Sequence, residues 1–275
     1  MATNAVYSYL TIGLLLATGL AHGWVREDFV SHVSSLTDGH GLGIYDGSKT
    51  TIQKHPYMVS LMVGNQFQCA GAIVSPSWAI TTGDCAQQVN TTAVVLAGSN
   101  DGVKGVSYNV KSVVLHPSYG QTYFDYDYGC VQISGKFKWS SKTKPVKLPK
   151  KDPKGNTPVI VTGWGSQTYG DASNGQMLQG TMQWLPKKKC ASFYANYGLG
   201  WTSRMACTYN KGKTTLCSGD FSDPFVQKGV VVGLFVTTLQ NGFCSKDAAP
   251  LILADIATVA PWIKTTTGAK YEDEI

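Results

Sequence analysis

Charged residues and helical patterns are both scarce in this chain. Only 15% of its 275 residues are charged and 43% are hydrophobic, a composition that excludes disorder and provides a core for one large all-β domain or two small barrels. Hydrophobic residues at helical spacing are nearly absent. Short β-branched and aromatic runs, such as residues 57–63 and 230–236, are instead separated by Gly, Pro, Asn and Ser. The pattern predicts two β-barrels and one terminal helix, near residues 259–265, with Pro261 at its start.

Residues 1–23 contain no Lys, Arg, Asp or Glu. Their apolar run, residues 9–20, ends in the small residues Ala21 and Gly23, which suit signal-peptidase cleavage. We therefore predict a signal peptide over residues 1–23 and a secreted, extracellular protein. A membrane anchor is the competing interpretation, but the run is shorter than the ~20 residues that span a bilayer, and no later segment is long enough. We expect no membrane insertion.

The chain contains seven cysteines, an odd number. Secretion predicts oxidised cysteines, so at least one thiol is left over or pairs with another chain. The glycosylation acceptor at Asn90, in the sequence Asn-Thr-Thr, fits the secretory route.

Lysine is concentrated in one stretch of the chain. Eight lysines occur there: Lys136, Lys138, Lys142, Lys144, Lys147, Lys150, Lys151 and Lys154. The stretch could attract a polyanion, but a solvated linker is the favoured interpretation, because basic runs are common. We expect no nucleic-acid partner. The Lys- and Pro-rich residues 140–158 are interpreted as the crossing between the two halves.

Five motifs occur in the order found in one family of proteases. They are Pro56-Tyr57-Met58-Val59-Ser60-Leu61, Cys69-Ala70-Gly71-Ala72-Ile73, Trp78-Ala79-Ile80-Thr81-Thr82, Val161-Thr162-Gly163-Trp164-Gly165 and Gly219-Asp220. They resemble the chymotrypsin-like serine proteases of the trypsin family. The resemblance implies an all-β fold of two six-stranded antiparallel β-barrels of the chymotrypsin type with a short C-terminal helix. It carries no conclusion about activity.

The resemblance also implies a domain division and a disulfide framework. Residues 24–43 resemble a pro-segment, residues 44–263 form the protease-like domain, and residues 264–275 form a C-terminal tail, of which residues 271–275 are acidic and expected to be frayed. The implied bridges are Cys69 with Cys85, Cys190 with Cys207, and Cys217 with Cys244. Cys130 is left over, and a buried thiol is the favoured state over an interchain bridge.

The family cleaves peptides with a serine nucleophile, a histidine base and an orienting aspartate. The family's histidine precedes a bridge cysteine in Thr-Ala-Ala-His-Cys, whereas residues 81–85 read Thr-Thr-Gly-Asp-Cys, which places Asp84 at the base position. The family's serine lies between Gly-Asp and Gly-Gly-Pro. Residues 219–224 read Gly-Asp-Phe-Ser-Asp-Pro, which places Phe221 at the nucleophile position. Only the aspartate is retained, as Asp127.

Neighbouring residues do not replace the missing groups. Ser222 is one position late, and the histidines after the predicted signal peptide, His32, His40, His55 and His116, lie outside the base position. Ser222 and Asp223 replace the two glycines that follow the family's serine. We expect them to reshape the loop and to place a carboxylate where negative charge should be stabilised.

The substrate pocket and the activation site are also altered. Leu251 stands where a glycine lines the family's pocket, Thr238 lies in the altered pocket strand, and Thr215 matches the acidic specificity residue, so we expect these side chains to block the pocket. Ile44 resembles the N-terminus that processing exposes, but Gly43 precedes it in place of Arg or Lys. Asp220 is retained, either for a loop hydrogen bond or for a salt bridge to a freed Ile44 amine.

Two carboxylates, Asp84 and Asp127, stand where the family has a His–Asp pair. They would repel each other, share a proton or recruit a cation. The sequence shows no further ligand cluster with metal spacing, so we predict neither a metal nor a cofactor.

These replacements favour a secreted, non-catalytic pseudoprotease that binds a protein through surface loops. Within the family, the pattern resembles the inactivated serine protease paralogues of the scabies mite, which are similar to mite digestive trypsin-like allergens. That resemblance implies inhibition of host complement, with complement components as partners. The alternatives are a residual hydrolase that uses Asp84 and Asp127, and a decoy that occupies a protease's substrates or inhibitors.

Overall fold

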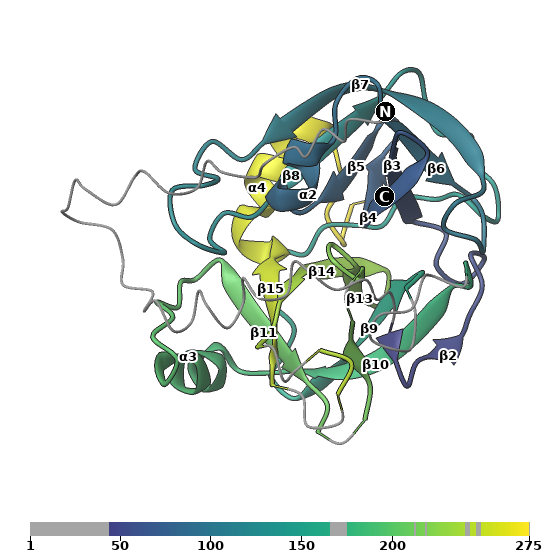
Figure 1. The fold of residues 1–275 in the computed structure, drawn as a ribbon. Helices are drawn as coiled ribbons and strands as arrows, with labels where there is room; N and C mark the ends of the chain where they lie inside the picture. The colour runs from purple at the N-terminus through teal and green to yellow at the C-terminus, as the bar shows by residue number, and fades with distance from the viewer. Residues whose placement is uncertain are drawn as a thin grey trace, which may run out of the picture.

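The computed structural model describes residues 44–165, 175–211, 213–217, 219–239, 243–245 and 249–274. The predicted signal peptide and pro-segment lie outside these residues. Two six-stranded antiparallel β-barrels make up most of the chain, one above the other in Figure 1, as the sequence predicted.

The first barrel is closed in the order β3-β4-β5-β8-β7-β6. Its strands are β3 (Met58–Val63), β4 (Gln66–Ser75), β5 (Trp78–Thr81), β6 (Val94–Ala97), β7 (Val106–Leu115) and β8 (Gly129–Ile133). A two-residue turn, Gly64-Asn65, joins β3 to β4, and both residues have positive φ, as a tight hairpin requires. Inward side chains such as Val59, Ile73 and Val131 are fully buried.

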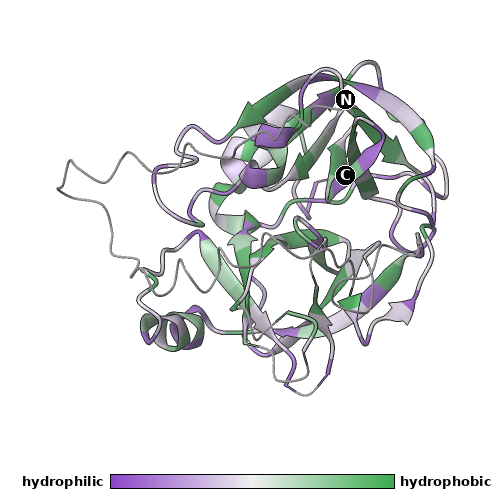
Figure 2. Ribbon diagram, viewed as in Figure 1, coloured by the Kyte–Doolittle hydropathy of each residue, from purple (hydrophilic) through white to green (hydrophobic). Residues whose placement is uncertain are grey.

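The second barrel follows the order β11-β15-β14-β13-β9-β10 and is closed by pairing of β10 with β11. Its strands are β9 (Thr157–Gly163), β10 (Leu178–Trp184), β11 (Met205–Tyr209), β13 (Pro224–Gln227), β14 (Val230–Thr237) and β15 (Leu251–Asp255). Three short strands are added: β1 (Ile44–Tyr45) pairs with β12 (Thr215–Leu216), and β2 (Ser48–Lys49) extends the sheet at β10. Hydrophobic residues concentrate in the strands of both barrels (Figure 2).

The terminal helix, α4 (Ile256–Thr267), begins three residues before the predicted start. Asp255 accepts a hydrogen bond from the N–H of Ala257 at 2.9 Å and caps the helix, while Gly268, with a φ of 69°, ends it. The helix packs against β8 of the first barrel and β14 of the second. Among the described residues, no helix is both long enough and apolar enough to cross a bilayer.

Two short helices were missed at the sequence level. They are α2 (Gly83–Gln88) and α3 (Lys187–Ala195). A helix of six or nine residues is too short to show periodicity, and each is tied to a strand by a disulfide, α2 through Cys69–Cys85 and α3 through Cys190–Cys207.

The expectation of a frayed C-terminus is wrong for its described part. The N–H of Leu148 donates to the carbonyl oxygen of Lys270 at 2.9 Å, and the N–H of Glu272 donates to that of Leu148 at 3.0 Å. Lys150 pairs with Asp273, and Lys264 pairs with Glu274. The acidic tail is therefore held by Lys150 and the main chain of Leu148 in the segment between the barrels and by Lys264 on α4, which sequence spacing does not reveal.

Candidate functional site

Helix α2 positions Asp84 above the retained Asp127. Thr82 caps the helix by accepting a hydrogen bond from the N–H of Cys85, and the N–H of Asp84 donates to Oδ1 of Asp127 at 2.8 Å. The side chain of Asp84 is exposed, and its Oδ1 accepts a hydrogen bond from Gln87 at 2.9 Å. Asp127 thus contacts the main chain of Asp84, while the Asp84 carboxylate turns toward the surface.

The carboxyl group of Asp127 is buried, and its pKa is raised to about 7. Burial is the main cause and the charge of Asp84 adds to it, while hydrogen bonds from the N–H groups of Asp84 and Gly83 oppose the rise. Sequence reasoning missed Tyr119 as part of this site. A Cβ atom on Gly83 would fall 2.5 Å from the Tyr119 ring, so glycine at position 83 is what allows that ring to lie beside Asp127.

Phe221, which the resemblance to the family matches to the nucleophile position, is part of a cluster of three aromatic rings. Its ring stacks on Phe235 at a centroid distance of 5.7 Å and an interplanar angle of 14°, and it lies 6.1 Å from Phe243. The rings of Phe235 and Phe243 are 6.1 Å apart in an edge-to-face arrangement. Such pairs contribute about 0.5–1.5 kcal/mol each beyond burial. The elbow residue therefore stabilises the second barrel.

Ser222 is fully buried and faces the first barrel. Its Oγ lies 2.5 Å from Oγ1 of Thr82 and accepts a hydrogen bond from the N–H of Thr82 at 3.3 Å, while its own N–H donates to the carbonyl oxygen of Phe235 at 2.9 Å. Its φ of 68° lies in the left-handed region, where the family has glycine. The hydroxyl group of Ser222 is thus directed at Thr82 in the first barrel.

The prediction for the Asp223 carboxylate is wrong. It was expected to face developing negative charge, but it is buried against β9, where a Cβ atom on Gly163 would fall 1.9 Å from Asp223 Oδ2. Its partner is the buried carboxyl group of Asp220. Burial, together with the interaction between the two groups, raises the pKa of Asp223 well above its usual value, and burial raises that of Asp220 to about 7.

Asp220 makes a hydrogen bond within its loop, which is one of the two roles that the sequence left open. Its Oδ2 accepts a hydrogen bond from the N–H of Cys217 at 3.0 Å, which holds the elbow loop. Apart from the carboxyl–carboxyl interaction, Asp220 Oδ1 and both oxygens of Asp223 have no hydrogen-bond partner among the described residues. The pair therefore requires a proton to be stable in this environment.

The three residues that were expected to block the pocket are almost or fully buried. Thr215 lies on β12, and Leu251 on β15 belongs to the hydrophobic cluster that includes Phe235 and Phe243. Thr238 Oγ1 donates to the carbonyl oxygen of Pro250 at 3.3 Å. All three side chains are thus shielded from solvent, and that of Leu251 belongs to the core of the second barrel.

The imidazoles of the two described histidines contact groups other than the carboxyl group of Asp127. The buried His55 contacts Thr50 at 3.0 Å, Gln179 at 2.8 Å and Tyr57 at 3.2 Å, and burial lowers its pKa. His116 stacks on Tyr126 at 4.6 Å. Neither imidazole contacts Asp84, Asp127 or Phe221. His32 and His40 lie outside the described residues.

The structure contains the three disulfides that the resemblance implied, Cys69–Cys85, Cys190–Cys207 and Cys217–Cys244. The first fixes α2 next to β4, and the third anchors the elbow loop, so both flank the candidate site. Cys130 is unpaired and buried on β8. Within the described parts of the chain, no three His, Cys, Asp or Glu side chains are grouped as metal ligands.

Two antiparallel barrels joined by a crossing, with the site between them, define the chymotrypsin class of fold. The trypsin family model matches residues 44–263, and the chain belongs to that family. It is 31% identical to Trypsin 5G1 of Aedes aegypti, over 82% of this chain and 85% of that protein, and 31% identical to Trypsin delta of Drosophila melanogaster, over 80% and 87%.

Two solved structures share the fold. Mouse neuropsin, a serine protease, superposes with a TM-score of 0.72 at 22% identity, over 81% of this chain and 99% of that one. The scabies mite inactivated protease paralogue S-D1 superposes with a TM-score of 0.69 at 23% identity, over 81% and 96%.

Proposed function

We propose that this protein is a secreted member of the trypsin family that does not cleave peptides and acts by binding a host protein. The observation that carries the proposal is the Phe221 ring, packed on Phe235 and Phe243 at the position that matches the family's nucleophile. A benzyl side chain has no lone pair to attack a carbonyl. The adjacent hydroxyl, on Ser222, is directed to Thr82.

The absence of a base supports the same proposal. Asp84 at the matching position is an exposed carboxylate held by Gln87, and the described histidines contact other groups. Loss of a catalytic triad removes on the order of 10⁶ in kcat, about 8 kcal/mol of transition-state stabilisation. The residues expected to block the pocket, Thr215, Thr238 and Leu251, are buried. Their burial favours binding of a partner through surface loops. It argues against binding of a peptide in the cleft, which is how a decoy would bind.

Secretion is supported by the three disulfides, which persist in oxidising compartments. The class of partner, a complement component of the host, rests on the resemblance to the scabies mite paralogues.

Activity is tested with a fluorophosphonate probe, which labels activated serines, and with an unbiased peptide library. We expect no labelling and no turnover by the purified protein. The matched controls are Ser222→Ala and Asp84→Asn: turnover that is the same in both variants and in the unsubstituted protein comes from a contaminant. Labelling or turnover that Ser222→Ala or Asp84→Asn abolishes would overturn the inactive assignment.

The partner is tested by complement-mediated lysis of sensitised erythrocytes in the presence of the folded protein, with the reduced and alkylated chain as the control. We expect the folded protein alone to inhibit lysis without hydrolysing any complement component. Lysis that is unaffected at saturating protein removes complement as the partner and leaves the inactive protease assignment standing.

A further inference from the structure

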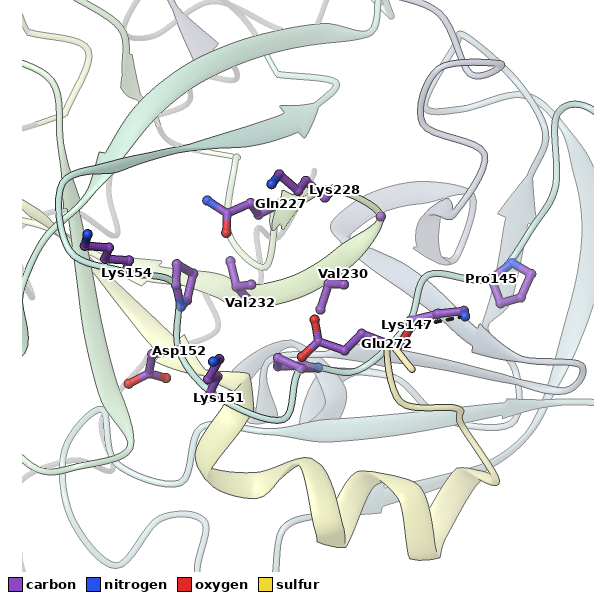
Figure 3. A pocket seen from close by; sticks show the side chains of 13 residues that line it. Pro145, Lys147, Lys151, Asp152, Lys154, Gln227, Lys228, Val230, Val232 and Glu272 are labelled. Carbon is purple, nitrogen blue, oxygen red and sulfur yellow. Dashed lines mark hydrogen bonds between the residues drawn. The ribbon is translucent and has the colours of Figure 1, made fainter. Parts of the chain in front are cut away.

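A basic groove of about 540 Å³ lies between the segment that joins the barrels and the β13–β14 hairpin (Figure 3). It shares no residue with the protease-like site. Four lysines line it: Lys147, Lys151 and Lys154 from the segment and Lys228 from the hairpin turn. In Figure 3 Lys151, Lys154 and Lys228 surround Val232. Residues more than 70 positions apart in sequence thus build one concave surface.

The walls of the groove are fixed by main-chain hydrogen bonds. The N–H of Lys147 donates to the carbonyl oxygen of Gly229 at 3.1 Å, and the N–H of Val231 donates to that of Lys147 at 3.0 Å. Lys228 and Gly229 both have positive φ, which defines a tight two-residue hairpin turn. The groove is therefore preformed, and a ligand would not have to order a loop on binding.

The acidic side chains of the groove are engaged by other groups. Asp152 pairs with Lys187 at 3.1 Å, and Glu272 accepts a hydrogen bond from the N–H of Lys150 at 3.1 Å. Lys147 donates to the carbonyl oxygen of Glu274 at 2.6 Å. The ammonium groups of Lys151, Lys154 and Lys228 have no ion-pair or hydrogen-bond partner in the described parts of the chain, so three cations remain for a ligand.

We propose that this groove binds a sulfated polysaccharide. Lysine presents a compact cation on a flexible stem, which suits repeated sulfate groups along a chain. The floor is apolar, formed by Val230, Val232, Pro149 and Pro153, against which the C–H faces of sugar rings can pack. No aromatic residue lines the groove, so it lacks the stacking platform that single-stranded nucleic acids require. The net charge of +6 adds long-range attraction for a polyanion.

The test is calorimetric titration of the full secreted protein with a heparin-derived octasaccharide, at about 50 and 200 mM salt. We expect binding that weakens at least tenfold between the two salt concentrations, because ion pairs form and counterions are released. The groove variant combines Lys151→Gln, Lys154→Gln and Lys228→Asn, with Asn chosen because it tolerates positive φ. It should lower the affinity at least tenfold at low salt.

The matched control removes three exposed lysines outside the groove, with Lys111→Gln, Lys188→Gln and Lys211→Gln. It should change the affinity by less than about threefold, because it lowers the net charge of the protein but leaves the groove unchanged. Lys154→Gln alone provides a variant with a minimal risk to folding and should show an intermediate loss. Three outcomes would overturn the proposal: no binding at low salt, equal losses in the two triple variants, or equal affinity for a fully desulfated octasaccharide. A single-stranded oligonucleotide that binds as tightly as the octasaccharide would also overturn it.

Discussion

The hydroxyl of Ser222 lies 2.5 Å from the hydroxyl of Thr82, and the two buried side chains join the elbow of the second barrel to the cap of α2 in the first. At this position the family has a glycine, which cannot make such a bond. The hydrogen bond thus connects the two segments that the resemblance matches to those of the family's histidine and serine.

Replacing Ser222 should reveal this bond. We expect Ser222→Ala to lower the free energy of unfolding by about 1–2 kcal/mol, the cost of a lost buried hydrogen bond. In a double-mutant cycle with Thr82→Ala, measured by urea unfolding, the coupling energy should be about 1 kcal/mol. Thr82→Ser keeps the hydroxyl and should keep the coupling. A coupling energy near zero would show that the two hydroxyls are neighbours without an energetic link.

Restoring a serine at the elbow should not restore activity. We expect Phe221→Ser to show no turnover of the peptide library, because Asp84 supplies no imidazole to accept the serine proton. The variant should also lose about 1–3 kcal/mol of unfolding free energy, since two ring contacts disappear. Phe221→Leu, which keeps an apolar side chain, should lose less. Turnover by Phe221→Ser that fluorophosphonate blocks would contradict the assignment of Asp84 as a lost base.

The sequence predicted features that depend on neighbours along the chain. The sequence matched Asp84 and Phe221 to the family's histidine and serine through their covalent neighbours Cys85 and Asp220, and this matching stays a prediction. The two barrels were predicted because strand patterns and turn residues are local signals. The three disulfides followed from the family's spacing.

Features that depend on contacts across the fold were not predictable. The partner of Ser222 lies 140 residues away, and the inward turn of Asp223 follows from free space above Gly163 on another strand. Lys228 joins Lys151 only because the hairpin packs on the segment between the barrels. Sequence spacing contains no information about these distances.

Cys130 should be a single, protected thiol. Burial raises its pKa to about 12, so the thiolate that attacks disulfide reagents is almost absent near neutral pH. We expect an aromatic disulfide reagent to detect no thiol in the folded protein and one per chain after unfolding in guanidinium. Cys130→Ala, the control, should give no thiol in either state. Rapid reaction in the folded state would show that the first barrel opens locally at β8.

The buried carboxyl pair of Asp220 and Asp223 should make the stability of the protein depend on pH. The pKa of Asp220 is about 7 in the folded protein, and that of Asp223 is also raised, against an ordinary value of 3.8. Below pH ~4 the two carboxyl groups are protonated in both the folded and the unfolded chain, so the pair does not lower the free energy of unfolding. Between pH ~4 and ~7 the unfolded chain releases protons that the folded chain retains, so the free energy of unfolding falls as pH rises.

Asp223→Asn should remove much of this penalty, because an amide carries no charge and can donate a hydrogen bond to Asp220 Oδ1. We expect the variant to gain about 2–4 kcal/mol over the unsubstituted protein at pH ~7.5 and little at pH ~4, measured by urea unfolding across that range. Asp46→Asn, at an exposed position with a φ of 55°, is the matched control and should show no such trend. A constant difference between Asp223→Asn and the unsubstituted protein at every pH would mean that the pair does not retain protons.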